Sequence, residues 1–156
     1  MVAALPRYYL DTSVLNYVFA THIPEHRDAS VALLDKARAG RVQGYISDIV
    51  LGELARAPEQ KRVELEDLIS SSNLGILDTT ERAVHLAQKY LEEGIFPGRY
   101  INDALHVAIA VVNSLDCVIS WNFRHIVRPT TRRRVNSANR LLGYPEIEIA
   151  SPEEVL

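Results

Sequence analysis

The chain has 156 residues, of which 47% are hydrophobic, with 17 basic and 20 acidic side chains and a formal net charge of −3. At roughly 100–200 residues per domain, this length predicts one domain over residues 1–156, and the apolar fraction excludes disordered, collagen-like and disulfide-scaffold proteins. The single Cys117 and the lack of an apolar run near the ~20 residues that span a bilayer favour a cytoplasmic protein that does not cross a membrane.

Short apolar runs alternate with longer stretches of helical spacing along the whole chain. This alternation predicts βα units and therefore an α/β fold with a central, mainly parallel sheet. Strands are expected at residues 8–10, 42–46, 74–77, 117–120 and 147–150, the last one at an edge of the sheet. Helices are expected directly after residue 11 and at residues 24–39, 48–57, 58–69, 80–94 and 103–113, followed by an arginine-rich helical region that ends at residue 142.

Asp11 comes directly after the first predicted strand. In open parallel sheets, ligands bind at the carboxyl ends of strands, so this position is typical of a functional carboxylate. The alternative is that Asp11 only caps the helix that follows, a role that aspartate fills well.

Glu53 lies on the apolar face of its predicted helix, because Ile49, Val50 and Ala57 are three or four residues away from it. Glutamate is almost never buried without a partner. The residue is therefore either a functional carboxylate or one half of a salt bridge to an arginine such as Arg56 or Arg82.

Asp103 opens the most apolar helix of the chain, which is expected to be central and buried, with Asn102 as its N-cap. The helix dipole favours an acid there by ~0.3–1 kcal/mol, which is a sufficient structural explanation. His106 follows one turn later, and an Asp-x-x-His pair can bind a metal. A histidine on an apolar helix is more often a hydrogen-bonded core residue, so His106 is left out of the predicted ligands.

Together the three acids predict a metal site, provided that they converge at one end of the sheet. Carboxylates ~4 Å apart repel by about 4 kcal/mol per pair at an effective dielectric constant near 20, so a cation has to offset the repulsion. Oxygen ligands without a cysteine or histidine cluster suit Mg²⁺ or Mn²⁺. Such an ion lowers the pKa of a bound water and neutralises charge on a phosphodiester.

Four short blocks together resemble the PIN-domain family, and in particular the VapC-type toxin nucleases of toxin-antitoxin pairs. They occur in the order and at the separations typical of that family and span about residues 8–127. The blocks are LDTSVL at residues 10–15, SDIVLGEL at 47–54, NDALHVA at 102–108 and ISWNFRHI at 119–126.

The resemblance implies a three-layer α/β/α domain and a metal-dependent ribonuclease. When the family's site residues are carried over by position, the Mg²⁺ or Mn²⁺ is bound by Asp11, Glu53 and Asp103. Thr12 or Ser13 assists them. Asp11 and Asp103 hold the cation, and Glu53 either binds it or orients the attacking water.

The resemblance also implies a small antitoxin partner and a homodimer. Many members have a fourth acid after the fourth strand, and here Asn122 occupies that position in the catalytic set. An amide adds no negative charge, so we predict a one-metal site or a weak two-metal site.

The charge of the chain is unevenly distributed. Six arginines and no acidic residue lie between Cys117 and Pro145. This pattern indicates a cationic face for an anionic partner, although a solvated helix has the same composition. We expect phosphates of an RNA substrate to contact Arg124, Arg128, Arg132, Arg133 and Arg134, with an affinity that falls as salt rises.

Other functions are less consistent with the sequence. Phosphate-binding glycine loops, the dinucleotide fingerprint and the serine-hydrolase elbow do not occur. The main alternative is a catalytically weak or inactive PIN-like module that binds RNA or a protein partner, since Asn122 replaces an acid. Trp121 is expected to pack beside its strand rather than stack on a base.

Overall fold

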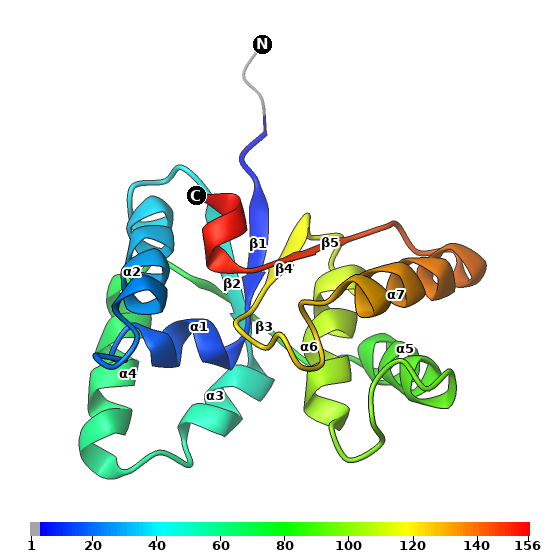
Figure 1. The fold of residues 1–156 in the computed structure, drawn as a ribbon, viewed down its shortest axis with the longest axis horizontal. Coiled ribbons are helices and arrows are strands. Elements are labelled where there is room, and N and C mark those ends of the chain that lie inside the picture. Colours follow the sequence, from blue (N-terminus) through cyan, green and yellow to red (C-terminus); the bar gives the residue numbers. More distant parts are fainter. Residues whose placement is uncertain (1–3) are drawn as a thin grey trace.

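The computed structural model describes residues 4–156, which form a five-stranded sheet with helices around it (Figure 1). All strand pairs are parallel, in the order β3-β2-β1-β4-β5. The strands are β1 (Arg7–Leu10), β2 (Gln43–Ser47), β3 (Gly75–Leu77), β4 (Cys117–Ile119) and β5 (Glu148–Ala150). The helices are α1 (Thr12–Tyr17), α2 (Pro24–Arg38), α3 (Asp48–Leu54), α4 (Glu59–Ser71), α5 (Glu81–Glu92), α6 (Ile101–Val112), α7 (Pro129–Leu142) and a C-terminal 3₁₀ turn (Pro152–Val155).

Helices cover both faces of the sheet, which confirms the predicted three-layer α/β/α fold. In Figure 1, α2 and α4 lie on one side of the sheet, and α5, α6 and α7 lie on the other. Helix α6 packs between α5 and β4, and its residues 104–111 are all buried, as the apolar sequence predicted. None of the helices within residues 4–156 is both long and apolar enough to cross a membrane.

Several element boundaries differ from the predicted ones. The prediction of Asn102 as an N-cap was wrong, because α6 already begins at Ile101 with Tyr100 as its N-cap. The chain turns before Asn102 is reached, since the Tyr100 N–H donates to the carbonyl of Pro97 at 2.9 Å. Helix α3 ends at Leu54, and the helical part of the arginine-rich segment starts only at Pro129.

The strand register aligns the carboxyl ends of β1, β2 and β4. Tyr9 of β1 pairs with Tyr45 of β2 and Val118 of β4. The carboxyl ends of β1, β2 and β4 therefore lie next to one another, and we call this region, with Asp11, Ser47 and Ser120, the carboxyl edge. Ligands of open parallel sheets bind at such an edge.

Candidate active site

Asp11 is held at the carboxyl edge by hydrogen bonds to both of its carboxylate oxygens. Its side chain is 4% exposed, and Oδ1 accepts from the Ser13 N–H at 3.1 Å and from the Ser13 hydroxyl. Oδ2 accepts from the hydroxyl of Ser120, at the end of β4. Asp11 thus caps α1, and it also joins the neighbouring strand end.

Glu53 on α3 is hydrogen-bonded to the first residue of α1 and to α6. Its Oε1 accepts hydrogen bonds from the Thr12 hydroxyl at 3.0 Å and from His106 Nε2 at 2.7 Å. Partial burial opposes ionisation, but the bonds from His106 and Thr12 outweigh it and hold the pKa of Glu53 below its usual range. The predicted alternative of a salt bridge to Arg56 or Arg82 is replaced by the contact with His106, and Arg56 adds only a weaker attraction.

Asn122 connects Asp103 to Asp11. Its Nδ2 donates to Asp103 Oδ2 at 3.4 Å, and its backbone N–H donates to Ser120 Oγ at 2.9 Å. Ser120 in turn donates to Asp11. The three acids that follow from sequence spacing are therefore brought to one region of the fold, in the first turn of α6, on α3 and after β1.

The amide of Asn122 has a defined orientation. Its Oδ1 accepts from the backbone N–H groups of Arg124 at 3.1 Å and His125 at 2.9 Å. If the amide oxygen and nitrogen were exchanged, the NH₂ group would face these two N–H donors. The Nδ2 must therefore face Asp103. Asn122 thus offers Asp103 a hydrogen-bond donor, at the position where an acid would offer a negative charge.

The pKa values of two of the acids are raised. Burial raises the pKa of Asp11, with attraction from His106 and hydrogen bonds from Ser120 and Ser13 acting against it. Burial also raises the pKa of Asp103, opposed by His106 and His125 and reinforced by the charges of Asp11 and Glu53. The acids therefore repel one another, and a cation between them would relieve both effects.

The donor chemistry fits a divalent cation that prefers oxygen. Within residues 4–156, no three His, Cys, Asp or Glu side chains converge closely enough to enclose an ion. Mg²⁺ does not need such a cage, because it keeps several waters and takes one or two carboxylates together with substrate phosphates. Asp11 and Asp103 supply such carboxylates, and Glu53 keeps one oxygen without a partner in the described residues.

Sequence reasoning left one residue out of the site. His106 is 2% exposed and hydrogen-bonded, as a core histidine was expected to be, but one of its partners is Glu53. The other is the hydroxyl of Tyr9, at 2.6 Å from Nδ1. The spacing from Asp103 placed His106 near the acids, whereas the contact with Glu53 crosses between two helices.

Comparisons with known proteins identify the family and the fold. A family model described as PIN domain matches residues 8–125. The chain belongs to the PIN-domain family. No curated protein matches the sequence.

Solved structures with the same fold include three toxin-antitoxin complexes. One is VapBC2 from Rickettsia felis bound to a DNA fragment from their promoter, with 18% identity, a TM-score of 0.61 and coverage of 93% of this chain and 98% of that chain. Another is DNA-bound VapBC from Salmonella typhimurium, with 20% identity, a TM-score of 0.62 and coverage of 95% of this chain and 99% of that chain. The third is a toxin-antitoxin complex from Klebsiella pneumoniae, with 19% identity, a TM-score of 0.59 and coverage of 79% of this chain and 93% of that chain.

The arginines that we predicted to contact RNA fall into two groups in this PIN domain. Arg124 and Arg133 are exposed, and their guanidinium groups make no hydrogen bond within residues 4–156. Arg128 donates to the backbone carbonyl of Arg124 at 3.1 Å, and Arg132 forms an ion pair with Glu154 at 3.1 Å. Arg134 donates to the backbone carbonyls of Glu93 and Gly94. The guanidinium groups of this second group thus have partners within the protein.

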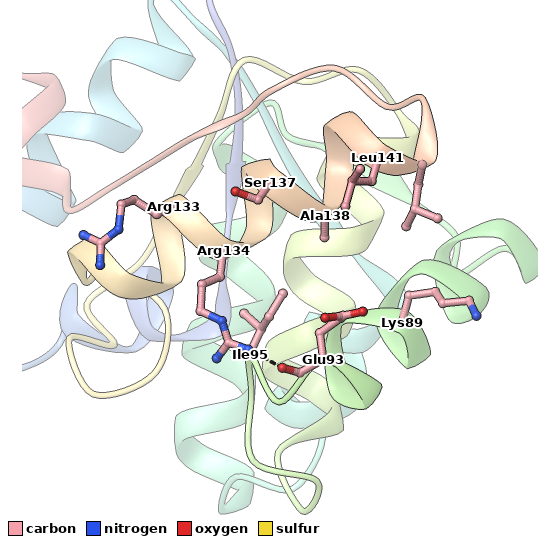
Figure 2. Close-up of a pocket in the computed structure, with 9 residues that line it drawn as sticks. Lys89, Glu93, Ile95, Arg133, Arg134, Ser137, Ala138 and Leu141 are labelled. Atoms are coloured by element: carbon pink, nitrogen blue, oxygen red, sulfur yellow. Dashed lines mark hydrogen bonds between the residues drawn. The ribbon is translucent and has the colours of Figure 1, made fainter.

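Figure 2 shows two of these arginines, Arg133 and Arg134, beside a pocket of 510 Å³ between α5 and α7. Arg134 reaches across to Glu93 at the end of α5, whereas Arg133 points away from the pocket. Leu141, 88% exposed, lines the same pocket. None of the three acids lines it, so this hollow is separate from the candidate active site.

Trp121 and Cys117 have structural roles in the PIN domain. Trp121 is 6% exposed, stacks on His26 with ring centroids 3.9 Å apart, and donates from Nε1 to Ser30 at 2.8 Å. Cys117 is buried in β4. Both placements confirm what the sequence indicated for these two residues.

Proposed function

We propose that this PIN-domain protein is a metal-dependent endoribonuclease and the toxin of a toxin-antitoxin pair. The observation that supports the nuclease most strongly is the grouping of Asp11, Glu53 and Asp103 at the carboxyl edge of a PIN fold. The VapBC complexes that share the fold support the pairing with an antitoxin. Residues 1–156 would act as one domain in the cytoplasm.

In this proposal each polar side chain of the site has a distinct role. Asp11 and Asp103 would hold Mg²⁺ or Mn²⁺, which when bound supplies an activated water and neutralises charge on the phosphodiester. Glu53 would bind the cation or orient the attacking water with Oε2, since Oε1 already accepts two hydrogen bonds. Asn122 would keep Asp103 in place through its Nδ2 and add no charge.

The substrate in this proposal is single-stranded or looped RNA. The site is acidic, so RNA phosphates can approach it only when a cation is present. The exposed Arg124 and Arg133 would then contact phosphates on either side of the cleaved bond. Arg128, Arg132 and Arg134 would add less, because they have partners within the protein.

The test is cleavage of labelled single-stranded RNA by the purified protein in Mg²⁺, Mn²⁺ or EDTA. We expect products only with a divalent metal and a loss of more than about 100-fold in Asp103→Asn, because removing a ligand costs more than the 10–100-fold typical of its supporting residues. Asp67→Asn is the matched control, since Asp67 is an exposed acid on α4. Equal cleavage by Asp103→Asn, Asp67→Asn and the wild type would contradict the proposed site.

A second function is favoured by one observation. Asn122 presents an N–H group to Asp103 where many relatives have an acid, which is consistent with an inactive PIN module that binds RNA or a protein. In that case RNA binding persists in EDTA, and no divalent ion yields a product.

The homodimer and the antitoxin partner are separate proposals. Size-exclusion chromatography with light scattering measures the oligomeric state, and a monomer at high micromolar concentration would contradict the dimer.

A further inference from the structure

A buried chain of hydrogen bonds runs from the interior of the sheet to Glu53. Ser47 Oγ lies 2.7 Å from the Tyr9 hydroxyl, which lies 2.6 Å from His106 Nδ1. His106 Nε2 lies 2.7 Å from Glu53 Oε1. Ser47 and Tyr9 are fully buried and His106 is 2% exposed, so solvent has little access to the first three members.

The chemistry of the partners fixes the direction of the last bond. An ionised carboxylate only accepts hydrogen bonds, so His106 Nε2 must carry the hydrogen that it shares with Glu53. The contact of Nδ1 with Tyr9 holds the ring from its other side. The imidazole is therefore fixed at both nitrogens, as ring orientation in metal sites generally is.

This arrangement leaves the two oxygens of Glu53 in different states. Oε1 accepts from both His106 and Thr12, whereas Oε2 has no hydrogen-bond partner among residues 4–156. One oxygen is thus used to fix the carboxylate, and the other is available. A carboxylate held in this way can present a single defined oxygen to a cation or a water.

The residues next to His106 along α6 are apolar. Its neighbours along α6, Leu105 and Val107, are buried, as is every residue from Ala104 to Val111. A leucine would fit such a helix without the cost of desolvating an imidazole. The buried polar chain ends on an acid of the candidate site rather than on the backbone, which distinguishes it from an ordinary satisfied core histidine.

We propose that His106 is a positioning residue for Glu53, supported from behind by Tyr9 and Ser47, which fixes Oε1 and so directs Oε2 to the cation or the attacking water. This inference rests on the proposed nuclease function. His106 does not contact the substrate in this scheme and acts only through Glu53.

The test compares His106→Leu, His106→Gln and Tyr9→Phe with the wild type. A glutamine amide can still donate to Oε1, whereas leucine cannot. Tyr90→Phe is the matched control for Tyr9→Phe, because Tyr90 is also buried and donates to Asn139 at a distance from the acids. The readouts are Mn²⁺ affinity by titration calorimetry, kcat and KM for RNA cleavage, and thermal unfolding.

We expect His106→Leu to lower the Mn²⁺ affinity or kcat by about 10–100-fold with little change in KM, as supporting residues of metal sites do. His106→Gln should recover most of this loss, Tyr9→Phe should show a smaller loss, and Tyr90→Phe should match the wild type.

Two outcomes would overturn the inference, and they are distinguishable. A folded His106→Leu with wild-type Mn²⁺ affinity and kcat overturns the role of His106 alone. A wild type that neither binds Mn²⁺ nor cleaves RNA overturns the proposed function and the inference together. If His106→Leu does not fold, Tyr9→Phe decides in its place, since equal values for Tyr9→Phe and Tyr90→Phe also contradict the proposal.

Discussion

The carboxyl edge and helix α7 carry charge in opposite ways. At the carboxyl edge, the buried Asp11 and the partly buried Glu53 and Asp103 accept hydrogen bonds from side chains that are distant in sequence. On α7, the charges lie in a single run, and the arginines are either exposed or bonded to exposed groups nearby. Few charges with many fixed partners are typical of a site, whereas many exposed charges indicate at most a surface for an anionic ligand.

Asn122→Asp is the change that tests the carboxyl edge most strongly. An aspartate can still accept hydrogen bonds from the backbone N–H groups of Arg124 and His125, so the local turn should persist. It would add a fourth negative charge beside Asp103 and remove the donor that Asp103 now has. We therefore expect Mn²⁺ to bind roughly 10-fold more tightly or with higher stoichiometry. A negative charge added within ~4 Å of the cation attracts it by several kcal/mol, from which the repulsion between the carboxylates is subtracted.

Metal titration of the wild type and Asn122→Asp measures this effect. The metal-free variant should also unfold at a lower temperature, because two carboxylates then face each other. Unchanged affinity and stoichiometry would contradict the prediction of a one-metal or weak two-metal site.

Asp103→Asn tests whether the acids of the carboxyl edge repel one another without metal. Burial raises the pKa of Asp103 above its ordinary value of 3.8, so the folded protein holds this proton more tightly than the unfolded chain. Such a group stabilises the fold fully below the unfolded pKa, and its contribution is lost as pH rises through the folded pKa. The amide that replaces the carboxyl group in this variant has no proton equilibrium in this range, so it adds no such pH dependence.

In EDTA at pH 7 we therefore expect Asp103→Asn to melt a few degrees above the wild type, given about 2–4 °C per kcal/mol for a protein of this size. The difference should shrink as the pH falls towards 3.8. Thermal unfolding by circular dichroism across this range is the measurement. A variant that is less stable than the wild type at pH 7 would mean that the Asp103 carboxylate contributes more through its contacts than it costs.

Glu53 should behave in the opposite way. Its pKa is lowered in spite of partial burial, because His106 and Thr12 donate to it. Its stabilising contribution is present above the unfolded pKa and is lost as pH falls through the folded pKa. The two sides of the site thus respond to pH with opposite signs, which makes Asp103→Asn more informative than the pH profile of the wild type alone.

Sequence spacing predicted the fold, which is confirmed, and singled out three acids, whose role as site residues stays a prediction. Asp11 follows an apolar strand, Glu53 interrupts an apolar helix face, and Asp103 opens a helix that is otherwise buried, so each is visible within one local pattern. Because parallel sheets bring strand ends together, the fold class led us to expect the three acids in one region of the molecule. Hydrogen bonds link Asp103 through Asn122 and Ser120 to Asp11 in that region.

The remaining features depend on contacts between distant segments. The bond between His106 and Glu53 joins residues 53 positions apart, and the ion pair of Arg132 and Glu154 joins residues 22 apart. Spacing along one helix carries no information about either contact. The N-cap of α6 was mispredicted because a turn at Pro97 precedes Asn102, and turn geometry overrode the capping preference of asparagine.

The smallest expected effects concern α7, where Arg133→Ala and Arg132→Ala separate the exposed arginines from the bonded ones. Arg133 is exposed and points away from α5, so its loss should weaken RNA binding and reduce the slope of log K against log salt by about 0.7 for one phosphate on a single strand. Arg132 is engaged with Glu154. Its loss should leave the salt slope nearly unchanged and cost less than about 1 kcal/mol of stability, as surface ion pairs do. Fluorescence anisotropy with labelled RNA and catalytically inactive protein across a salt series measures both slopes, and an equal reduction in the two variants would show that the pair with Glu154 opens when RNA binds.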